Sequence, residues 1–318
     1  MKAVVYTKYG PPDVLHLTDL AKPVPRNNEV LIKVHATTVT VGDTRMRSFT
    51  VPRGLWLPSR IYLGVLKPKR SILGMELAGE VEAAGKDVTR FRPGDAVFAS
   101  TFEVGFGGYA EYKCLPEDGL LAIKPANLTF GEAAAAVGGG MTALRCLEQG
   151  RIQPGQTVLV YGASGAVGTN AVQIASRHLG AEVTGVCSTA NLDLVRSLGA
   201  IRVIDYTQDD FTRDGPIYDV VFDAVAKVAP SHAKKALKTT GVYLNVHKHS
   251  DAPANARGAA LLAVKELIEA GKLRPVIDRV YPLEQIVEAH RYVDQGHKRG
   301  NVVITVGQTG LNTQEKPS

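Results

Sequence analysis

A glycine-rich turn lies in the middle of the chain, where an apolar run passes directly into a stretch with helical character. It reads VLVYGASGAVG from Val158 to Gly168, and its glycines have the spacing Gly-x-x-Gly-x-x-Gly. Backbone N–H groups at the start of a helix lack partners within the helix, and the helix dipole adds partial positive charge. The turn therefore predicts an anion site that suits a dinucleotide pyrophosphate. Ser164 replaces the second glycine of the usual fingerprint, so the context must decide.

The sequence that follows about residue 126 places this turn in a fold. Short apolar runs alternate there with helical patterns, which is typical of a parallel sheet with crossover helices. We expect strands at 157–161, 183–187, 202–204, 219–223 and 242–246. We expect helices at Val167–His178, Asn191–Leu198, Ser231–Leu237 and Gly258–Ala270. The glycine turn then falls at the first strand-to-helix connection of a βαβ unit, as a dinucleotide site requires.

The first part of the chain is typical of β-structure instead. Gly and Pro turns separate four strand-like runs, at Ala3–Tyr6, Val30–Val34, Leu77–Val81 and Asp95–Phe98. Strand-like runs return after Leu273, around a helix expected near Leu283–Gln295. We therefore expect a β-domain at 1–125, a nucleotide-binding domain at 126–272, a return to the first domain at 273–306 and a disordered tail at 307–318.

Charge and cysteine usage limit the partners that this chain is expected to have. The net charge of +6 is small and spread along the chain, which indicates solubility rather than nucleic-acid binding. We interpret the one dense basic run, Lys67–Arg70, as a solvated loop rather than a phosphate or RNA site. Three distant cysteines without Cys-x-x-Cys spacing argue against a disulfide framework and a structural zinc site. With no signal-peptide pattern and no membrane-length apolar run, the predicted location is the cytoplasm.

Five segments in the right order resemble the medium-chain dehydrogenase/reductase superfamily, specifically its zinc-free quinone oxidoreductase and alkenal reductase branch. They are RPGDAVF from Arg92, GGYAEY from Gly107, PGQTVLV from Pro154 with the glycine turn, SLGA from Ser197, and GNVV from Gly300. The resemblance covers nearly the whole chain. It implies an α/β protein with a GroES-like β-domain, a Rossmann domain with a doubly wound parallel sheet, and an active site between them.

The positions that bind zinc in other members of this superfamily carry poor ligands here. Those members have a Cys after the strand that corresponds to residues 30–36, and a Gly-His-Glu further on. This chain has Thr40 in the loop VTVGDT and Met75 in Gly-Met-Glu. A thioether without nearby Cys or His suits zinc badly, so we predict no metal site. Asp43 and Glu76 could be ligands or catalytic carboxylates, and for Glu76 we favour a structural hydrogen-bond network.

Two other patterns are interpreted as unrelated to function. Tyr109 and Lys113 have the Tyr-x-x-x-Lys spacing of short-chain dehydrogenases, but they precede the glycine turn and lie in a strand-like segment. His247 and His249 flank Lys248, and alternate residues of an extended segment face opposite sides, which argues against a metal there.

Without a metal to polarise an alcohol, the chemistry that remains is hydride transfer to an electron-poor carbon. Quinones and α,β-unsaturated carbonyls accept hydride because charge moves onto oxygen, where hydrogen-bond donors stabilise it. By resemblance, Thr40 and Asp43 stand at the cleft. Tyr62 is the most plausible aromatic donor in the apolar stretch Leu55–Leu63, which is either a pocket wall or a loop buried against the β-core. Our predicted catalytic residues are therefore Thr40, Asp43 and Tyr62.

The predicted cofactor-binding residues cluster at the turn and at strand ends. By resemblance, Thr142 contacts the cofactor near a break at Gly138–Gly140, and the loop after Asp223 lies beside the nicotinamide, although Ala226 replaces a common glycine. Ligands in such sheets bind beyond the carboxyl ends of strands. The full set is Thr142, Gly162, Ser164, Gly165, Ala166, Val167, Gly168, Ser188, Thr189, Asn191, Tyr206, Asp223, Ala224, Val225, Asn245 and Val246.

The loop after the second strand predicts a preference for NADPH. NAD-specific sites place an acidic residue about twenty positions beyond the glycine turn, and it would repel a 2′-phosphate. Here that position is Ser188, in a neutral loop rich in donors. Alternatively, Ser188 and Thr189 only cap the helix that begins near Asn191. Relatives often carry Arg or Lys at Ala190, so we expect measurable use of NADH as well; Tyr206 resembles a residue that packs near the adenosine.

The leading function is therefore NADPH-dependent reduction of a small-molecule quinone or enone. One rival is an enoyl-thioester reductase, with Lys67, Lys69 and Arg70 at a basic entrance. Another is a nucleotide-binding regulatory or RNA-binding protein that has lost turnover. The sequence leaves the oligomeric state open, with a homodimer among the alternatives.

Overall fold

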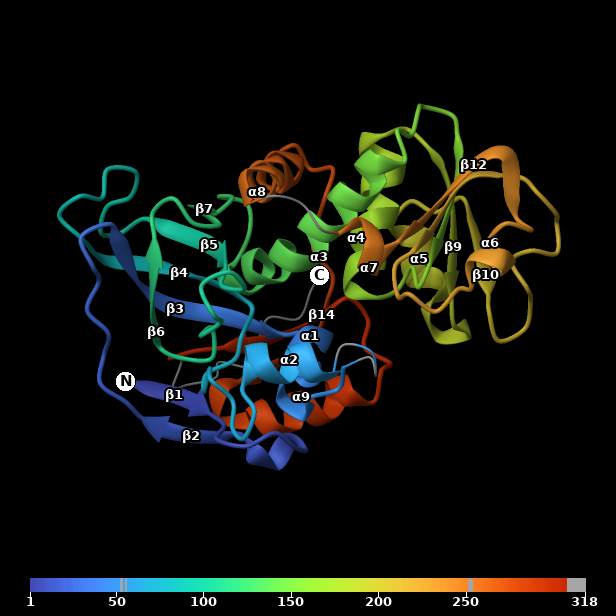
Figure 1. Cartoon of the computed structure of the whole chain (residues 1–318). Coiled ribbons are helices and arrows are strands. Elements are labelled where there is room, and N and C mark those ends of the chain that lie inside the picture. The colour runs from blue at the N-terminus through green and yellow to red at the C-terminus, as the bar shows by residue number, and fades with distance from the viewer. Residues whose placement is uncertain (52–53, 55, 251–253, 308–318) are drawn as a thin grey trace.

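Two large sheets organise the chain into two lobes (Figure 1). The computed structural model describes residues 1–51, 54, 56–250 and 254–307. Within these residues, the first lobe has the strand order β13-β14-β3-β4-β5-β7, with β6 also paired to β3, and the second has the order β10-β9-β8-β11-β12. A small hairpin of β1 (Lys2–Val5) and β2 (His16–Asp19) completes the first lobe.

The long strand β3 is the centre of the first lobe. It pairs antiparallel with β4, β6 and β14, and its alternate side chains supply Ile32 and Val34 to a buried core. The last strand, β14, pairs Val302 with Val39, so the end of the described chain returns to the first sheet. The strands are β3 (Glu29–Val39), β4 (Glu76–Ala84), β5 (Ala96–Ser100), β6 (Tyr112–Pro116), β7 (Leu121–Ile123), β13 (Ile277–Pro282) and β14 (Asn301–Thr305).

All pairings in the second sheet are parallel, and apolar runs such as Val158–Val160 are buried within it. The chain builds outward from β8 through β9 to β10 and then crosses to β11 and β12, which makes β8 and β11 the topological switch point. The predicted α/β fold with a GroES-like and a Rossmann-type unit is confirmed. The strands are β8 (Thr157–Tyr161), β9 (Glu182–Cys187), β10 (Arg202–Asp205), β11 (Tyr218–Asp223) and β12 (Leu237–Asn245).

Helices flank both sheets, as Figure 1 shows. They are α1 (Val41–Ser48), α2 (Trp56–Leu63), α3 (Phe130–Gln149), α4 (Ala166–Gln173) with a π-helical extension (Ile174–His178), α5 (Leu192–Ser197), α6 (Pro230–Ala233), α7 (Val246–His249), α8 (Ala254–Glu269) and α9 (Ile286–Asp294). Single 3-10 turns cover Pro12–Val14, Thr189–Asn191 and Leu283–Gln285. No helix in the described part of the chain combines the length and the apolar character needed to cross a membrane.

The long helix α3 joins the two lobes, and it corrects one sequence interpretation. A capping box between Thr129 and Glu132 starts it, and it continues through Gly138–Gly140 where we expected a break. The glycines serve close packing instead. A β-carbon at Gly139 would lie 2.7 Å from the carbonyl oxygen of Ala166, so only glycine lets α3 approach α4 this closely.

The region around β12 also differs from expectation. The predicted helix Ser231–Leu237 is wrong in extent, because α6 ends at Ala233 and Leu237 already begins β12. The strand ends at Asn245, whose side-chain oxygen accepts a hydrogen bond from the His247 N–H at 3.0 Å and so starts α7. His247 and His249 therefore lie on a helical turn rather than on the extended segment that we expected.

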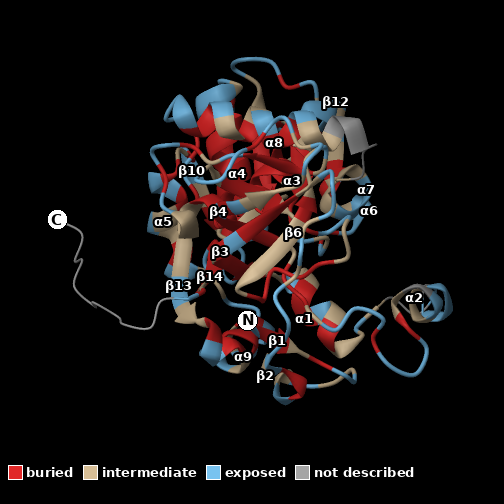
Figure 2. Ribbon diagram, turned by 90° about the vertical axis from the view of Figure 1, so that its left-hand side faces the viewer, coloured by how far each residue is buried: buried red, intermediate tan, exposed pale blue. Residues whose placement is uncertain are grey.

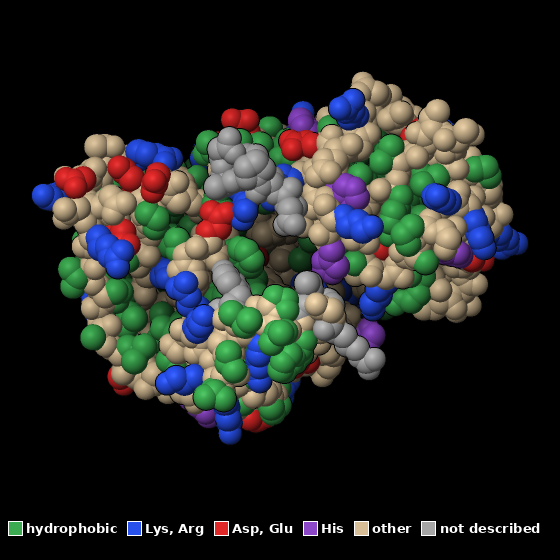
Figure 3. All heavy atoms as spheres, in the orientation of Figure 1, with side chains coloured by type: hydrophobic (Ala, Val, Ile, Leu, Met, Phe, Trp, Pro, Cys, Tyr) green, Lys and Arg blue, Asp and Glu red, His purple; other side chains and the backbone are tan. Residues whose placement is uncertain are grey.

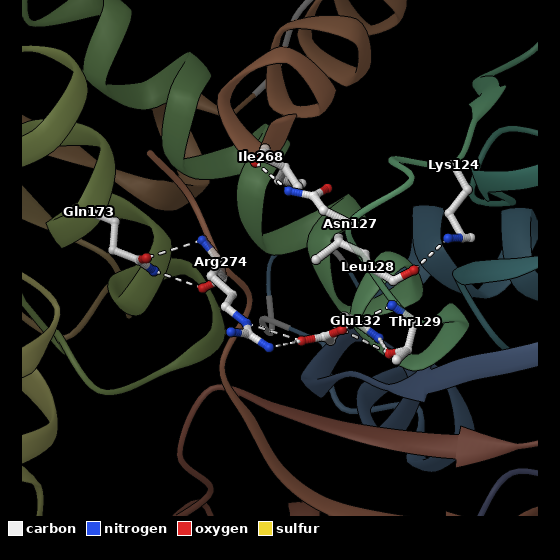
Figure 4. A network of polar contacts seen from close by, with 8 residues as sticks. All are labelled: Lys124, Asn127, Leu128, Thr129, Glu132, Gln173, Ile268 and Arg274. Atoms are coloured by element: carbon white, nitrogen blue, oxygen red, sulfur yellow. Dashed lines mark hydrogen bonds and ion pairs between the residues drawn. The ribbon is translucent and has the colours of Figure 1, made fainter. Parts of the chain in front are cut away.

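A polar network ties together the two places where the chain crosses between the lobes (Figure 4). Glu132 accepts hydrogen bonds from the Arg274 guanidinium at 3.1 and 3.0 Å. The Gln173 side chain accepts from the Arg274 N–H at 3.1 Å and donates to its carbonyl at 3.0 Å. Asn127 donates to the Ile268 carbonyl at 3.0 Å. Backbone groups that would otherwise be left without partners are thus satisfied where the lobes meet.

Helix α2 stands apart from the body of the protein (Figure 2). Trp56, Leu57 and Ile61 are exposed at 50, 63 and 58%. The alternative that this stretch is a loop buried against the β-core is therefore wrong.

Candidate active site

Different physical constraints explain why each of the three positions in the turn carries glycine. Gly162 has a φ of +79°, and a β-carbon there would lie 2.6 Å from Val225. At Gly168 a β-carbon would lie 2.1 Å from the carbonyl oxygen of Gly162, so the helix can pack on the turn only with glycine. The packing of the protein itself requires glycine at both positions.

At Gly165, by contrast, neither the backbone conformation nor packing within the protein requires glycine. It is the N-cap of α4 with φ −81° and ψ 176°, and a β-carbon there would meet only the Gly162 oxygen, at an ordinary 3.5 Å. The first backbone bond of α4 runs from Thr169 to Gly165, so the N–H groups of Ala166 and Val167 come before the helical ladder. The open space beside these donors fits a group that approaches the backbone closely, as a pyrophosphate does.

The first lobe reaches the same place. Gly165 forms a parallel bridge with Gly300, whose N–H donates to the Ser164 carbonyl at 2.8 Å. Two residues further, Val302 pairs with Val39 of β3, and Thr40 follows directly. The glycine turn and the Thr40 loop are therefore held side by side by β14. Figure 3 shows a hollow in the surface between the lobes, and in the same view Figure 1 places α1, α3 and α7 around it.

Asn191 orients two hydroxyl groups beside the turn. Its amide donates to Ser164 Oγ at 3.3 Å and to Ser188 Oγ at 3.0 Å. Because both serine oxygens accept, both serine hydrogens are free to donate to a further group. Neither Ser188 nor Asn191 makes a side-chain capping bond at the helical turns that follow them, so the capping alternative is wrong for Ser188.

Thr189 and Tyr206 lie at the same edge with different surroundings. The Thr189 hydroxyl bonds to the carboxylate of Asp205, so its hydrogen is committed within the protein. Tyr206 is half exposed, and its ring lies 6.3 Å from that of Tyr161 at the end of β8. At this edge, Ser188 therefore has a hydroxyl hydrogen free to donate, which Thr189 lacks, and Tyr206 presents an exposed ring on which a flat group can pack.

Asp223 has a structural task. Its two carboxylate oxygens accept from the N–H groups of Val225 at 3.1 Å and Val228 at 2.7 Å, and Tyr243 donates to it at 3.2 Å. These bonds hold the loop that contains Ala226, which keeps a left-handed backbone with φ +56° although it is not glycine. Ala224 is buried and Val225 lies against the glycine turn, so of this loop Val225 is placed to face a ligand.

Thr40 and Asp43 form a tight pair at the start of α1. Their capping box joins Thr40 Oγ1 to Asp43 Oδ2 at 2.6 Å, with backbone bonds at 3.0 Å in each direction. Asp43 Oδ1 accepts from the Gly74 N–H at 2.9 Å. Asp43 is fully buried, whereas Thr40 keeps partial exposure. Burial raises the pKa of Asp43 to about 6, against the opposing effect of these hydrogen bonds.

Behind Asp43 lies a buried chain of polar groups that the sequence analysis did not find. Tyr109 Oη lies 3.1 Å from His290 Nε2, and Arg47 contacts His290 Nδ1 at 3.1 Å and Asp294 at 2.7 Å. Burial, and next the charge of Arg47, lower the pKa of His290 to about 3. The sequence pattern assigns no functional role to Tyr109, whose contact with His290 depends on the fold. The available signal was His290 itself, a polar residue on the apolar face of α9 beside Ala289 and Val293.

The zinc positions of the superfamily carry a donor set that does not fit zinc. Met75 Sδ lies 3.6 Å from Thr40 Oγ1, and no group of three or more His, Cys, Asp or Glu suited to a metal occurs among the described residues. Glu76 is buried; the Gly138 backbone is a hydrogen-bond partner of its carboxyl group, whereas Oε2 has no partner, and the structural network that we favour for it stays a prediction. Burial raises its pKa to about 8, and burial lowers the pKa of the nearby Lys298 to about 8.

The remaining predicted residues have the following places. Thr142 is half-buried on α3, one turn from Gly138, which faces Glu76. Asn245 and Val246 mark the carboxyl end of β12 and the start of α7. The side chain of Tyr62 lies outside the described residues, although its backbone belongs to α2.

Comparison with known proteins identifies the class that this fold and site define. A family described as alcohol dehydrogenase GroES-like domain matches residues 26–125, and families described as zinc-binding dehydrogenase match residues 166–267 and 250–304. The chain belongs to the medium-chain dehydrogenase/reductase superfamily. The predicted resemblance to quinone oxidoreductases and alkenal reductases is confirmed by the relatives that follow.

The 2-methylene-furan-3-one reductase of Solanum lycopersicum is 33% identical over 96% of this chain and 79% of that protein. The quinone oxidoreductase of Sus scrofa is 34% identical over 94% of this chain and 95% of that protein. The solved structure of the quinone oxidoreductase from Coxiella burnetii is similar with a TM-score of 0.84 at 30% identity, covering 96% of this chain and 99% of that chain.

Proposed function

We propose that this protein is an NADPH-dependent reductase of quinones and α,β-unsaturated carbonyl compounds that works without a metal ion. The observation that carries the proposal is the junction at β14, which sets the open turn at Gly165 beside the hydroxyl of Thr40. A relative named NADPH-dependent alkenal/one oxidoreductase, from Arabidopsis thaliana, supports it at 32% identity over 96% of this chain.

The cofactor side is assigned from the contacts of the second lobe. The backbone donors at Gly165–Gly168 hold the pyrophosphate, Ser188 donates to the 2′-phosphate, and Tyr206 packs on the adenosine. The nicotinamide end lies toward Thr142, Val225, Asn245 and Val246. When bound, NADPH supplies a hydride to the substrate.

The substrate side is assigned to the first lobe. Reduction of a conjugated carbonyl moves negative charge onto the carbonyl oxygen, and a hydrogen bond placed there stabilises this charge. Thr40 supplies the hydroxyl, supported from behind by Asp43. On α2, the ring of Trp56 lies 6.1 Å from that of Phe49 at the end of α1, and the exposed side chains of Trp56, Leu57 and Ile61 offer an apolar surface to a flat substrate.

A substrate panel tests the proposal. Quinones, enals and enones are each offered with NADPH and with NADH, and consumption of the reduced cofactor is followed by absorbance. We expect turnover of at least one class, faster with NADPH. Faster turnover of an enoyl thioester than of the matched free enone would favour the thioester reductase, and salt-sensitive RNA binding without any turnover would favour the regulatory alternative. A cytoplasmic location and a homodimer stay predictions.

A further inference from the structure

The hydrogen positions in the buried chain behind Asp43 follow from the donors and acceptors that are present. A guanidinium has only donors, so His290 Nδ1 must accept from Arg47. With its lowered pKa, His290 is neutral, and its single N–H is therefore on Nε2. This N–H donates to Tyr109 Oη at 3.1 Å. The hydroxyl hydrogen of Tyr109 thus points away from His290.

Asp43 is the acceptor that faces this hydrogen. The Tyr109 hydroxyl is in hydrogen-bonding contact with the Asp43 carboxyl, and the neighbouring charge helps raise the pKa of Tyr109 after burial. Asp43 also accepts from the N–H groups of Thr40 and Gly74. These three donors have fixed directions, so the Thr40 hydroxyl is the one partner of Asp43 that is able to reverse its role.

The protonation of Asp43 therefore decides what Thr40 offers to the cleft. When Asp43 is ionised, the Thr40 hydrogen points to Oδ2 at 2.6 Å and is not available to a substrate. When Asp43 is protonated on Oδ2, that proton is donated to Thr40 Oγ1, and the Thr40 hydrogen is free to turn outward. The other acceptor near it, Met75 Sδ at 3.6 Å, is a weak one that a carbonyl oxygen replaces. Thr40 Oγ1 has a second lone pair for the Asp43 N–H, which it accepts at 3.0 Å.

We propose that Asp43 and Thr40 form a proton relay, in which Asp43 is the buried acid and Thr40 carries its proton to the carbonyl oxygen of the substrate. The relay rests on the proposed function above. Tyr109, His290 and Arg47 are positioning residues, because they hold the carboxyl group with its Oδ2 toward Thr40 and do not touch the substrate.

The step balances as follows. The substrate gains at its β-carbon the hydride supplied by the bound reduced nicotinamide cofactor, and its C=C electron pair moves to give an enolate. The enolate oxygen binds the Thr40 proton as the Thr40 O–H bond breaks, and Thr40 Oγ1 binds the proton of Asp43. The enol becomes the saturated ketone in water, and a water proton returns to Asp43 through Thr40, which has the exposed surface that Asp43 and Tyr109 lack.

The relay predicts a pH dependence with a defined origin. Among the described residues with shifted pKa values, Tyr6, Tyr109 and Glu76 feel the charge of Asp43. Phenol and carboxyl groups are neutral or negative, so none of the three supplies a positive charge. Arg47 and His290 lie one step further back. With a pKa of about 6, Asp43 loses its proton as the pH rises from 5 to 8. The donor form of Thr40 is lost over the same range.

The first experiment measures binding rather than turnover. The probe is 4-phenylbutan-2-one, the saturated product of an enone, titrated by calorimetry into the NADP⁺-bound protein between pH 5 and 8. We expect the wild-type affinity to fall several-fold, by up to about tenfold, across this range, since the hydrogen bond from the neutral Thr40 hydroxyl to the ketone oxygen is lost. Asp43→Asn keeps an N–H toward Thr40 and cannot ionise, so its affinity stays independent of pH. Thr40→Val binds weakly at every pH.

The second experiment measures kcat with the matching enone. We expect wild-type kcat to fall as the pH rises above 6, with a loss of about 100-fold or more in Thr40→Val and in Asp43→Asn. Thr40→Ser restores most of the rate and the pH profile. Thr44→Val is the matched control, because Thr44 lies on the same helix and, within the part of the chain that the structure describes, its hydroxyl bonds to the Val41 carbonyl alone, at 3.2 Å. A wild-type kcat independent of pH from 5 to 8, or full activity of Thr40→Val, would overturn the relay.

An infrared titration separates failure of the relay from failure of the proposed function. The carbonyl band of a protonated carboxyl group that disappears near pH 6, and that is absent in Asp43→Asn, reports Asp43 directly without any substrate. This band with no enone turnover would refute the proposed function and, with it, the relay. Enone turnover without this band would refute the relay alone. If Asp43→Asn does not fold, the comparison of Thr40→Val with Thr40→Ser decides the binding titration and the pH profile of kcat.

Discussion

The carboxyl group of Glu76 lies directly against Gly138 of α3. A β-carbon at Gly138 would come within 2.5 Å of Oε1, while Oε2 is buried without a partner. Helix α3 thus packs against a buried carboxyl group. Burial raises the pKa of this group to about 8, which keeps it protonated at neutral pH. This contact makes Glu76 a pH-sensitive element in the packing between α3 and the first sheet.

We predict that Glu76→Gln changes the pH dependence of stability. The native state keeps the Glu76 proton up to about pH 8, whereas an ordinary glutamate loses it near 4.5. Between these values the native state binds more protons than the unfolded chain, so the free energy of unfolding falls as the pH rises, by up to about 1.4 kcal/mol per pH unit. Glutamine has the same shape and does not ionise, so the variant lacks this fall.

Urea unfolding at pH 6.5 and 8 measures the effect. Asp43 titrates in the wild type and in the variant alike, so its contribution cancels in the difference between the two proteins. Glu80→Gln, an exposed position on the same strand, is the control and should follow the wild type. Parallel pH profiles of wild type and Glu76→Gln would show that Glu76 is ionised in the native protein.

We predict that Gly165→Ala weakens NADPH binding and leaves the fold intact. Its backbone angles suit alanine and its nearest neighbour lies at 3.5 Å, so the free energy of unfolding should stay within about 1 kcal/mol of the wild type. The methyl group would occupy the space above the donors of α4, so we expect the Kd for NADPH to rise about tenfold or more. Fluorescence titration and urea unfolding measure the two effects.

Two other glycines serve as comparisons for this variant. Gly168→Ala should destabilise the protein by about 2 kcal/mol or more, because its β-carbon would lie 2.1 Å from a backbone oxygen. Gly258→Ala on α8 meets no atom within 4 Å and should leave binding unchanged. Unaltered NADPH affinity in Gly165→Ala would remove the turn from the cofactor site.

We predict a preference for NADPH that Ser188→Asp reverses. A free serine hydroxyl oriented by Asn191 donates to a phosphate, and such a bond to a charged group contributes roughly 1.5–3 kcal/mol, or about tenfold or more in affinity. Aspartate would repel the phosphate and bind the ribose hydroxyls of NADH. The measurement is kcat/KM for both cofactors, with Ser197→Asp, exposed on α5, as the control. Equal or better use of NADH by the wild type would contradict this assignment.

We predict that the purified protein contains no stoichiometric zinc and that chelators leave its activity unchanged. The reason is the donor set of Thr40 and Met75 at the positions that bind zinc in other members of the superfamily. Elemental analysis before and after EDTA treatment checks it. One zinc per chain, with activity lost on its removal, would contradict the prediction.

Local features of the sequence determined the parallel sheet and the turn. The strands that lead into and follow the turn are short apolar runs, and they lie where the pattern predicts them because such runs are buried on both faces of a parallel sheet. The glycine spacing is also local, because the backbone at Gly162 and the packing at Gly168 involve residues only a few positions apart. Helix α3, which the pattern did not predict, shows the limit of such local features. Its glycines weaken the local helix propensity, but packing of α3 against Glu76 and α4 outweighs this weakness.

Only the tertiary structure decided which polar groups meet. Tyr109 and His290 are 181 positions apart, and Arg47 and His290 are 243 positions apart, so no spacing in the sequence predicts that they are in contact. They touch because α9 follows β13 and packs beside α1 and the first sheet. The pKa values of Asp43 and Glu76 have the same origin, because burial by distant segments raises them above the values of a free carboxyl group. The residue types were in the sequence, but their chemistry depends on the water that the fold removes.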